Sequence, residues 1–126
     1  MASHQSLILV VEDEPFLRQS LEILLRNIGY LVETSANAAE ASASICKKSY
    51  DLLILDLHLP DGNGIELLPF VRQRHPDMPV LVFTADGARE TITKAFQSGA
   101  SDYLIKPVDP QLLSKKIAEF LSIKGS

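Results

Sequence analysis

Short apolar segments alternate with amphipathic ones along the chain. Several of the apolar segments carry hydrophobic residues at consecutive positions, as strands covered by helices on both faces usually do. The five segments expected to be strands are LILVV at 7–11, YLVET at 30–34, DLLILD at 51–56, PVLVFT at 79–84 and SDYLI at 101–105. A stretch long enough for a helix follows each of them, so the pattern predicts five strand–helix units in series.

Residues at the expected helix ends support this interpretation. Pro15 suits a first helical turn and Gly29 a helix stop. Asn37, followed three residues later by Glu40, is a variant of the capping box. Further helices are expected over about 88–98, ending before Gly99, and from Pro110 onward with Asp109 as the cap.

The helix expected near 65–74 contains Pro69, which has no amide hydrogen to donate inside a helix. We therefore expect a kink or a late start there. Five strand–helix units in series predict an α/β fold, with a doubly wound five-stranded parallel sheet and right-handed crossovers. A single domain over 1–126, with its core at about 6–123 and no output domain, is expected.

Composition and charge narrow the class of protein. Hydrophobic residues make up 46% of the 126 residues and charged residues 22%, as in ordinary globular domains. A net charge of −4 without a basic cluster argues against direct nucleic-acid binding by this segment. Cys46 is the only cysteine, MASHQS lacks signal-peptide features, and no apolar run could span a bilayer. A cytoplasmic location without membrane contact is expected.

Polar side chains interrupt the apolar pattern where the expected strands end. Glu12 and Asp13 follow the first strand, Asp56 ends the third, Thr84 and Ala85 end the fourth, and Lys106 follows the fifth. In an open α/β sheet the carboxyl ends of the strands share one edge, where ligands bind. These side chains should therefore converge, although they are far apart in the sequence.

The chemistry of this group points to a phosphoryl site. Three carboxylates close together repel one another unless a cation is present. Oxygen ligands without a His or Cys cluster favour Mg²⁺. Lys106 and Thr84 would suit the oxygens of a phosphoryl group, and Asp56 is the natural nucleophile for it. Glu14 is expected to face water beside the first helix.

Four motifs together resemble the receiver domain of two-component response regulators, the CheY-like family. They are VVEDE at 10–14, DLHLPDGNG at 56–64, VFTA at 82–85 and GASDYLIKP at 99–107. The resemblance implies a flavodoxin-like sheet with strand order 2-1-3-4-5. It also implies that Asp56 accepts a phosphoryl group from a sensor histidine kinase or phosphotransfer protein.

The resemblance further implies roles for individual residues. Asp13, Asp56 and the backbone carbonyl of His58 would bind Mg²⁺. Glu12 would act through water; family members often carry Asp at that position, so metal affinity and dephosphorylation rate could differ. Lys106 would pair with the phosphoryl oxygens, beside Thr84 and Ala85, and the Lys106–Pro107 bond is expected to be cis.

The same resemblance implies a switch. The hydroxyl of Thr84 would turn toward the phosphoryl group and the ring of Tyr103 would swing inward behind it. The surface formed by 88–98, 101–105 and the last helix would then change, control an output domain or partner, and serve for homodimer formation. We also hypothesise a contact between His58 and Asp86 that modulates phosphoryl lifetime.

Three alternatives stay open at this point. A phosphatase of the haloacid dehalogenase type would need a second acid two residues after the nucleophile, where this chain has His58. A flavodoxin-like or nucleotide-binding module would want a glycine-rich phosphate loop where Glu12, Asp13 and Glu14 stand. A receiver that serves only as a phosphate-independent docking surface is the third alternative.

Overall fold

The computed structural model describes residues 5–125, with side chains described to residue 122. Five parallel strands form one sheet in the order β2-β1-β3-β6-β7. These strands are β1 (Leu7–Val11), β2 (Leu31–Ser35), β3 (Leu52–Leu55), β6 (Val80–Thr84) and β7 (Asp102–Ile105). In the order of these five strands along the chain, this is the expected 2-1-3-4-5 arrangement.

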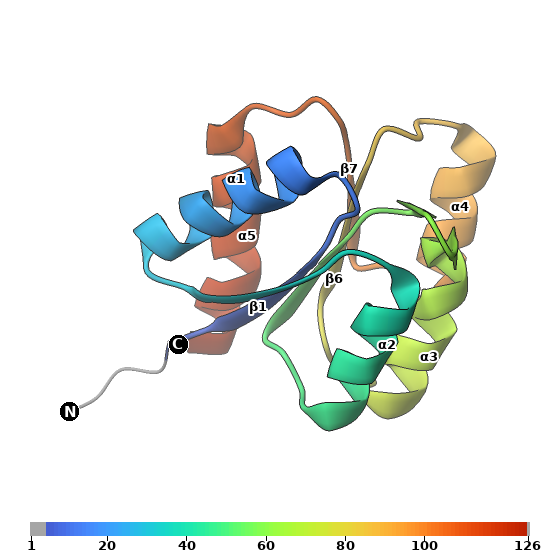
Figure 1. Ribbon diagram of the computed structural model, residues 1–126, viewed down its shortest axis with the longest axis horizontal. Coiled ribbons are helices and arrows are strands. Elements are labelled where there is room, and N and C mark those ends of the chain that lie inside the picture. Colours follow the sequence, from blue (N-terminus) through green and yellow to red (C-terminus); the bar gives the residue numbers. More distant parts are fainter. Residues whose placement is uncertain (1–4, 126) are drawn as a thin grey trace.

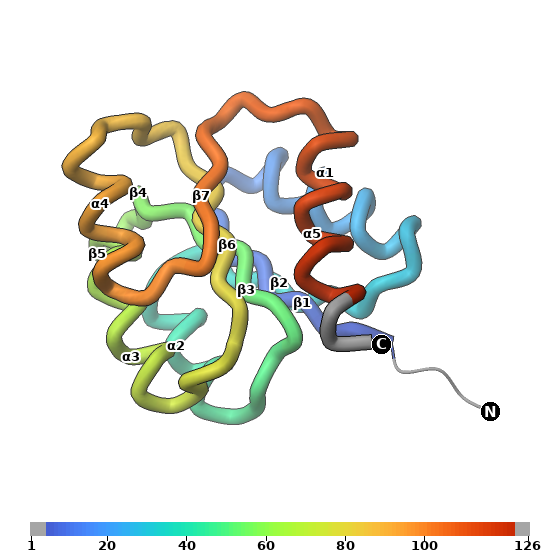
Figure 2. Tube along the Cα trace, turned by 180° about the vertical axis from the view of Figure 1, so that it is seen from behind, coloured from blue at the N-terminus to red at the C-terminus, as the bar shows by residue number. Residues whose placement is uncertain are grey.

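Helices cover both faces of the sheet. Figure 1 shows α1 and α5 on one side and α2, α3 and α4 on the other. Their bounds are α1 Pro15–Ile28, α2 Ala38–Lys47, α3 Leu67–Arg74, α4 Arg89–Ser98 and α5 Pro110–Gly125. Figure 2 shows the same two layers from behind. The doubly wound fold predicted from the alternating pattern is therefore confirmed.

Alternate residues of the central strands feed two separate cores. On one face, Leu9 and Val11 of β1 pack with buried residues of α2, α3 and α4. On the other face, Ile8 and Val10 pack with buried residues of α1 and α5. Since β1, β3 and β6 are buried on both faces, their sequences are continuously apolar instead of alternating.

The region after β3 differs most from the simple strand–helix pattern. A two-stranded antiparallel hairpin, β4 (His58–Leu59) and β5 (Gly62–Asn63), precedes the short 3₁₀ helix η1 (Gly64–Glu66). The helix α3 then begins at Leu67, which confirms the late start. Pro69 lies in its first turn, where amides have no partner inside the helix, so the proline costs no helical hydrogen bond.

Helix ends follow the sequence signals closely. Asn37 caps α2 by accepting a hydrogen bond from the amide of Glu40 at 2.8 Å. Glu14 is exposed, as expected, and it also caps α1 by accepting bonds from the amides of Phe16 and Leu17. Gly29 ends α1 at φ 120°, a conformation that disfavours other residues.

Two further expectations concern the backbone and the membrane. The Lys106–Pro107 peptide bond is cis, as the resemblance implied. Within residues 5–125, every helix falls short of the length and apolar character needed to cross a bilayer.

Candidate functional site

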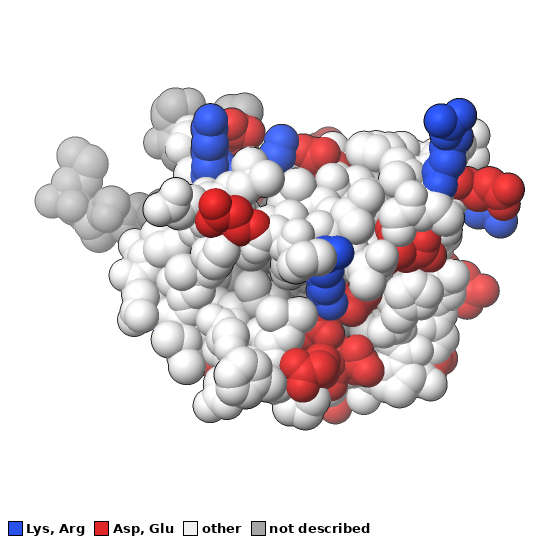
Figure 3. Space-filling view, turned by 90° about the horizontal axis from the view of Figure 1, so that it is seen from above, with Lys and Arg blue, Asp and Glu red and all other residues white. Residues whose placement is uncertain are grey.

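The polar residues at the strand ends meet at one edge of the sheet. Glu12 follows β1, Asp56 follows β3, Thr84 ends β6 and Lys106 follows β7. Glu12, Asp56 and Thr84 are buried with exposed fractions of 2%, 6% and 0%. Figure 3 looks down on the molecule from above and shows acidic side chains gathered next to basic ones on this face. Buried polar groups of this kind need partners, which the site supplies.

Lys106 joins the two buried carboxylates. Its Nζ lies 2.6 Å from Oε1 of Glu12 and 2.9 Å from Oδ2 of Asp56. The same ammonium group lies 5.5 Å from the centre of the Phe83 ring, within the range of a cation–π contact. The lysine is therefore fixed between the acids instead of extending into solvent.

Backbone groups complete the hydrogen bonding of the acids. The amide of His58 donates to Oδ1 of Asp56 at 3.2 Å, and the amide of Glu14 donates to Oε2 of Glu12 at 3.1 Å. Arg18 of α1 donates from Nη1 to the carbonyl oxygens of Glu12 (2.9 Å) and Asp13 (3.1 Å). Sequence reasoning missed Arg18, because a lone arginine on an amphipathic helix gives no signal of such a contact.

The two buried acids differ in pKa. Burial raises the pKa of Glu12 above its usual value, despite its hydrogen bonds from Lys106 and the Glu14 amide. Burial also acts to raise the pKa of Asp56, but hydrogen bonds from Lys106, Thr84 and the His58 amide outweigh it and hold that pKa below the usual range. The site thus favours the ionised form of Asp56 more strongly than that of Glu12.

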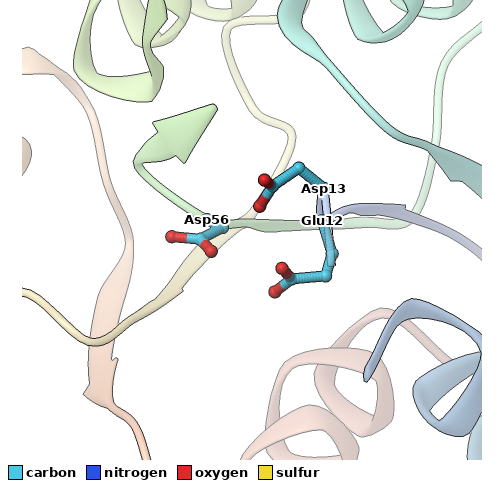
Figure 4. Close-up of side chains that lie close together, drawn as sticks. All are labelled: Glu12, Asp13 and Asp56. Atoms are coloured by element: carbon cyan, nitrogen blue, oxygen red, sulfur yellow. The ribbon is translucent and has the colours of Figure 1, made fainter. Parts of the chain in front are cut away.

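Asp13 joins the pair to form a cluster that fits a divalent cation. One carboxylate oxygen from each of Glu12, Asp13 and Asp56 lies within 4.8 Å of the other two. Figure 4 shows the three side chains close together at the ends of their strands. The cluster holds three carboxyl groups beside the single ammonium group of Lys106, so acidic groups outnumber basic ones there. The oxygen-only donor set and this excess of acidic groups suit Mg²⁺.

The residues expected to form the switch lie beside the cluster. Thr84 is fully buried, and its Oγ1 lies 3.5 Å from the amide nitrogen of Asp86. The hydroxyl of half-buried Tyr103 donates to the carbonyl oxygen of Asp86 at 2.5 Å, and its ring centre lies 6.5 Å from that of Phe96. Ala85, between these contacts, is exposed.

The hypothesised contact between His58 and Asp86 is present. The His58 Nε2 lies 3.4 Å from Oδ2 of Asp86. The Asp86 carboxylate also accepts hydrogen bonds from the Ala88 amide at 3.0 Å and the Thr91 hydroxyl at 3.1 Å. The hydrogen bonds from the Ala88 amide and the Thr91 hydroxyl, together with the nearby His58 ring, lower the pKa of Asp86. Whether this contact changes phosphoryl lifetime stays a prediction.

Comparison with known proteins identifies the family. Residues 8–118 match the sequence profile described as the response regulator receiver domain. The chain belongs to this family. A receiver domain of a two-component response regulator is therefore present, and the dehalogenase-type phosphatase and flavodoxin-like alternatives lose their support.

Relatives with known names carry the same segment inside longer proteins. The response regulator protein PilR of Pseudomonas aeruginosa is 38% identical over 117 residues, which is 93% of this chain and 26% of PilR. The photosynthetic apparatus regulatory protein RegA of Cereibacter sphaeroides is 37% identical over 99% of this chain and 65% of RegA. The chain thus spans about a quarter of PilR and just under two thirds of RegA.

Solved structures show the same fold over nearly the whole chain. A two-component response regulator from Clostridium difficile superimposes with a TM-score of 0.92 at 30% identity, covering 97% of this chain and all of the other. A CheY-like receiver domain protein from Methanospirillum hungatei gives a TM-score of 0.91 at 34% identity, covering 94% of this chain and 95% of the other.

Proposed function

We propose that this receiver domain accepts a phosphoryl group on Asp56, in a Mg²⁺-dependent reaction, from a sensor histidine kinase or phosphotransfer protein. The observation that carries the proposal is the bridge from Lys106 to the buried carboxylates of Glu12 and Asp56. Membership of the receiver family supports it. On this proposal the domain is a signalling switch whose only chemistry is its own phosphorylation and dephosphorylation.

The transfer step follows from the groups around Asp56. A carboxylate oxygen of Asp56 attacks the phosphorus of the donor, forming an O–P bond while the P–N bond to the donor imidazole breaks and its electron pair stays on nitrogen. Lys106, already 2.9 Å from this carboxylate, then pairs with the phosphoryl oxygens. Thr84, which hydrogen-bonds to Asp56, and the backbone at Ala85 would supply further donors.

A bound magnesium ion would supply positive charge that offsets the acids and the phosphoryl oxygens. The side chains of Asp13 and Asp56 and the backbone carbonyl of His58 would hold it, with Glu12 acting through water. Glu12 is buried and bonded to Lys106, so in this chain it also orients the lysine. The glutamate side chain is longer than that of aspartate, and this extra length lets its carboxylate reach the ammonium group of Lys106.

The switch would be read out on the surface of α4, β7 and α5. Tyr103 of β7 already bonds to the loop that precedes α4, through the carbonyl of Asp86. The phosphoryl group would interact more favourably with one of two arrangements of Thr84 and of this contact, and phosphorylation would therefore shift the population toward that arrangement. Phe96, Ile105 and Leu112 are large apolar residues of these elements with 43–47% of their surface exposed, which suits a partner, an output domain or a homodimer.

Phosphorylation can be tested by mass. Incubation with acetyl phosphate and Mg²⁺ should add one phosphoryl group to the protein, and the Asp56→Asn variant should stay unmodified. Omitting Mg²⁺ should abolish the adduct. If acetyl phosphate fails, beryllofluoride binding to the native protein and not to the variant is the second test. Failure of both would favour the phosphate-independent docking module, in which the same surface acts without modification.

The contact between His58 and Asp86 gives a further test of the chemistry. The pair lies near Asp56, whose carboxylate accepts a hydrogen bond from the His58 amide, so we expect its loss to change access of water to the acyl phosphate. Decay of the phosphorylated protein should accelerate in both His58→Ala and Asp86→Ala. Unchanged decay in both variants would rule out the pair as a determinant of phosphoryl lifetime.

A further inference from the structure

The loop that follows Asp56 is tied to a different helix by a single side chain. This loop contains the hairpin β4–β5, and Asp61 lies at its turn. Oδ1 of Asp61 accepts a hydrogen bond from the amide of Ala38 at 2.8 Å, and Oδ2 accepts one from the amide of Ala39 at 2.9 Å. These are the first two residues of α2, so one carboxylate caps a helix 22 residues earlier in the chain.

The contact completes the N-terminus of α2. The amides of the next two residues, Glu40 and Ala41, bond to the side chain and the backbone carbonyl of Asn37. Asp61 satisfies the remaining two amides, and a negative charge at this end also interacts favourably with the helix dipole. The two amide bonds lower the pKa of Asp61, so the carboxylate is ionised at neutral pH.

Leu59 packs β4 into the core, but the turn beyond it lies at the surface. Residues 60–63 are all exposed. A hollow of about 260 Å³ lies between the hairpin and the neighbouring helices, with Ala38, Ser42 and Gly62 in its lining. Apart from the contact of His58 with Asp86, the other hydrogen bonds described for this loop, such as that from the Gly64 amide to the Leu57 carbonyl at 2.7 Å, join residues within it. At the turn itself, the Asp61 carboxylate therefore provides the contact that links the hairpin to α2.

The strand held in this way carries part of the phosphoryl site. His58 lies in β4, where its amide donates to Asp56 and its ring contacts Asp86. Gly64, at the other end of the loop, approaches so closely that an added Cβ would lie 2.8 Å from the carbonyl oxygen of Asp56. A shift of the hairpin would therefore displace the backbone of His58 and Gly64, which lie against the carboxylate and the carbonyl oxygen of Asp56.

We propose that Asp61 is a positioning residue for the phosphoryl site, holding the hairpin so that the loop after Asp56 is preset to bind Mg²⁺. The inference rests on the proposed function. Asp61 touches neither the ion nor the phosphoryl group and acts through the loop. If loss of the contact leaves about one tenth of the molecules with the loop correctly placed, Mg²⁺ affinity falls about tenfold.

The test measures Mg²⁺ affinity directly, by titrating MgCl₂ into the folded protein and following backbone amide shifts of residues 56–64 by NMR. Asp61→Asn keeps the shape of the side chain but replaces one acceptor oxygen with a donor. We expect its dissociation constant for Mg²⁺ to rise about tenfold, as for loss of an outer-shell partner.

Two further variants separate positioning from general stability. Asn37→Ala removes the other cap of α2 without touching the hairpin, so its Mg²⁺ affinity should match the native protein even if α2 is weakened. Ala38→Pro removes one donor from the helix side; the first helical position tolerates proline, and Asn37 is already extended at φ −157° and ψ 173°. It should weaken Mg²⁺ binding in the same direction as Asp61→Asn.

Each outcome decides the matter. Native affinity in Asp61→Asn, or equal losses in Asp61→Asn and Asn37→Ala, would overturn the positioning role. If Asp61→Asn does not fold, the affinity of Ala38→Pro decides in its place. A native protein that neither binds Mg²⁺ nor accepts a phosphoryl group would instead overturn the proposed function, and the inference with it.

Discussion

Replacing Lys106 with methionine tests the electrostatics of the site most directly. The lysine contacts Glu12 at 2.6 Å and Asp56 at 2.9 Å, while only 18% of its own side chain is exposed. Methionine keeps most of the length and apolar contact of the side chain and removes the charge. The two buried carboxylates then face each other without a cation.

The size of the effect follows from burial. Removing one partner of a buried ion pair typically destabilises a protein by about 3–5 kcal/mol. The site opens to water beside exposed Asp13, and raised carboxyl pKa values can relieve part of the repulsion, so the lower end applies. We expect Lys106→Met to lower the free energy of unfolding by about 3 kcal/mol without Mg²⁺.

Magnesium should compensate for part of this loss. Removing the ammonium removes a positive charge next to the proposed ion site, and about tenfold tighter Mg²⁺ binding corresponds to about 1.4 kcal/mol. At a Mg²⁺ concentration of about 100 times the native dissociation constant, the native protein gains about 2.7 kcal/mol and the variant about 4.1 kcal/mol. The variant thus gains about 1.4 kcal/mol more than the native protein, and the difference in their free energies of unfolding should narrow from about 3 to about 1.6 kcal/mol.

The assay is urea unfolding of both proteins in EDTA and in MgCl₂, with linear extrapolation to water. Lys116→Met is the matched control, because Lys116 pairs at 2.8 Å with Asp102, at the other end of β7 from Lys106, and both side chains are about 30% exposed. The free energy of unfolding of Lys116→Met should be close to that of the native protein, and Mg²⁺ should stabilise both by the same amount. A loss below about 1 kcal/mol in Lys106→Met, or no extra stabilisation by Mg²⁺, would refute the reasoning.

Three further predictions concern the free energy of unfolding. Burial and the hydrogen bond to Glu33 raise the pKa of Tyr50 to about 12 from 10.0, so stability from this pair is complete below pH 10 and is lost as the pH rises toward 12; Tyr50→Phe should remove this alkaline loss in pH-dependent unfolding. Gly64→Ala should cost about 2 kcal/mol in urea unfolding and slow phosphorylation, because its Cβ would collide with the Asp56 carbonyl; native stability would show that the loop can move aside. Arg72→Met should cost about 2 kcal/mol, because the arginine donates to carbonyl oxygens in two loops, and a thermal melt equal to that of the native protein would contradict this.

The sequence by itself determined the layers of the fold and the composition of the site. Continuous apolar strands such as β3 and β6 can only be buried on both faces, and helices separated by such strands must cover them. Parallel strands then bring their carboxyl ends to one edge, so Glu12, Asp56 and Lys106 had to meet there. Periodicity and strand direction are local properties, which is why a single chain reveals them.

Only the tertiary structure decided how those residues pair. Lys106 lies 94 positions from Glu12, and no local pattern specifies that its ammonium bridges Glu12 and Asp56. The hairpin β4–β5 has two residues in each strand, too few for a period, and its tie from Asp61 to α2 exists only once the two elements pack. Hydrogen bonds between distant segments depend on differences of a few tenths of an ångström in the separation of two atoms. The packing of the helices and strands sets these separations, and the sequence pattern does not.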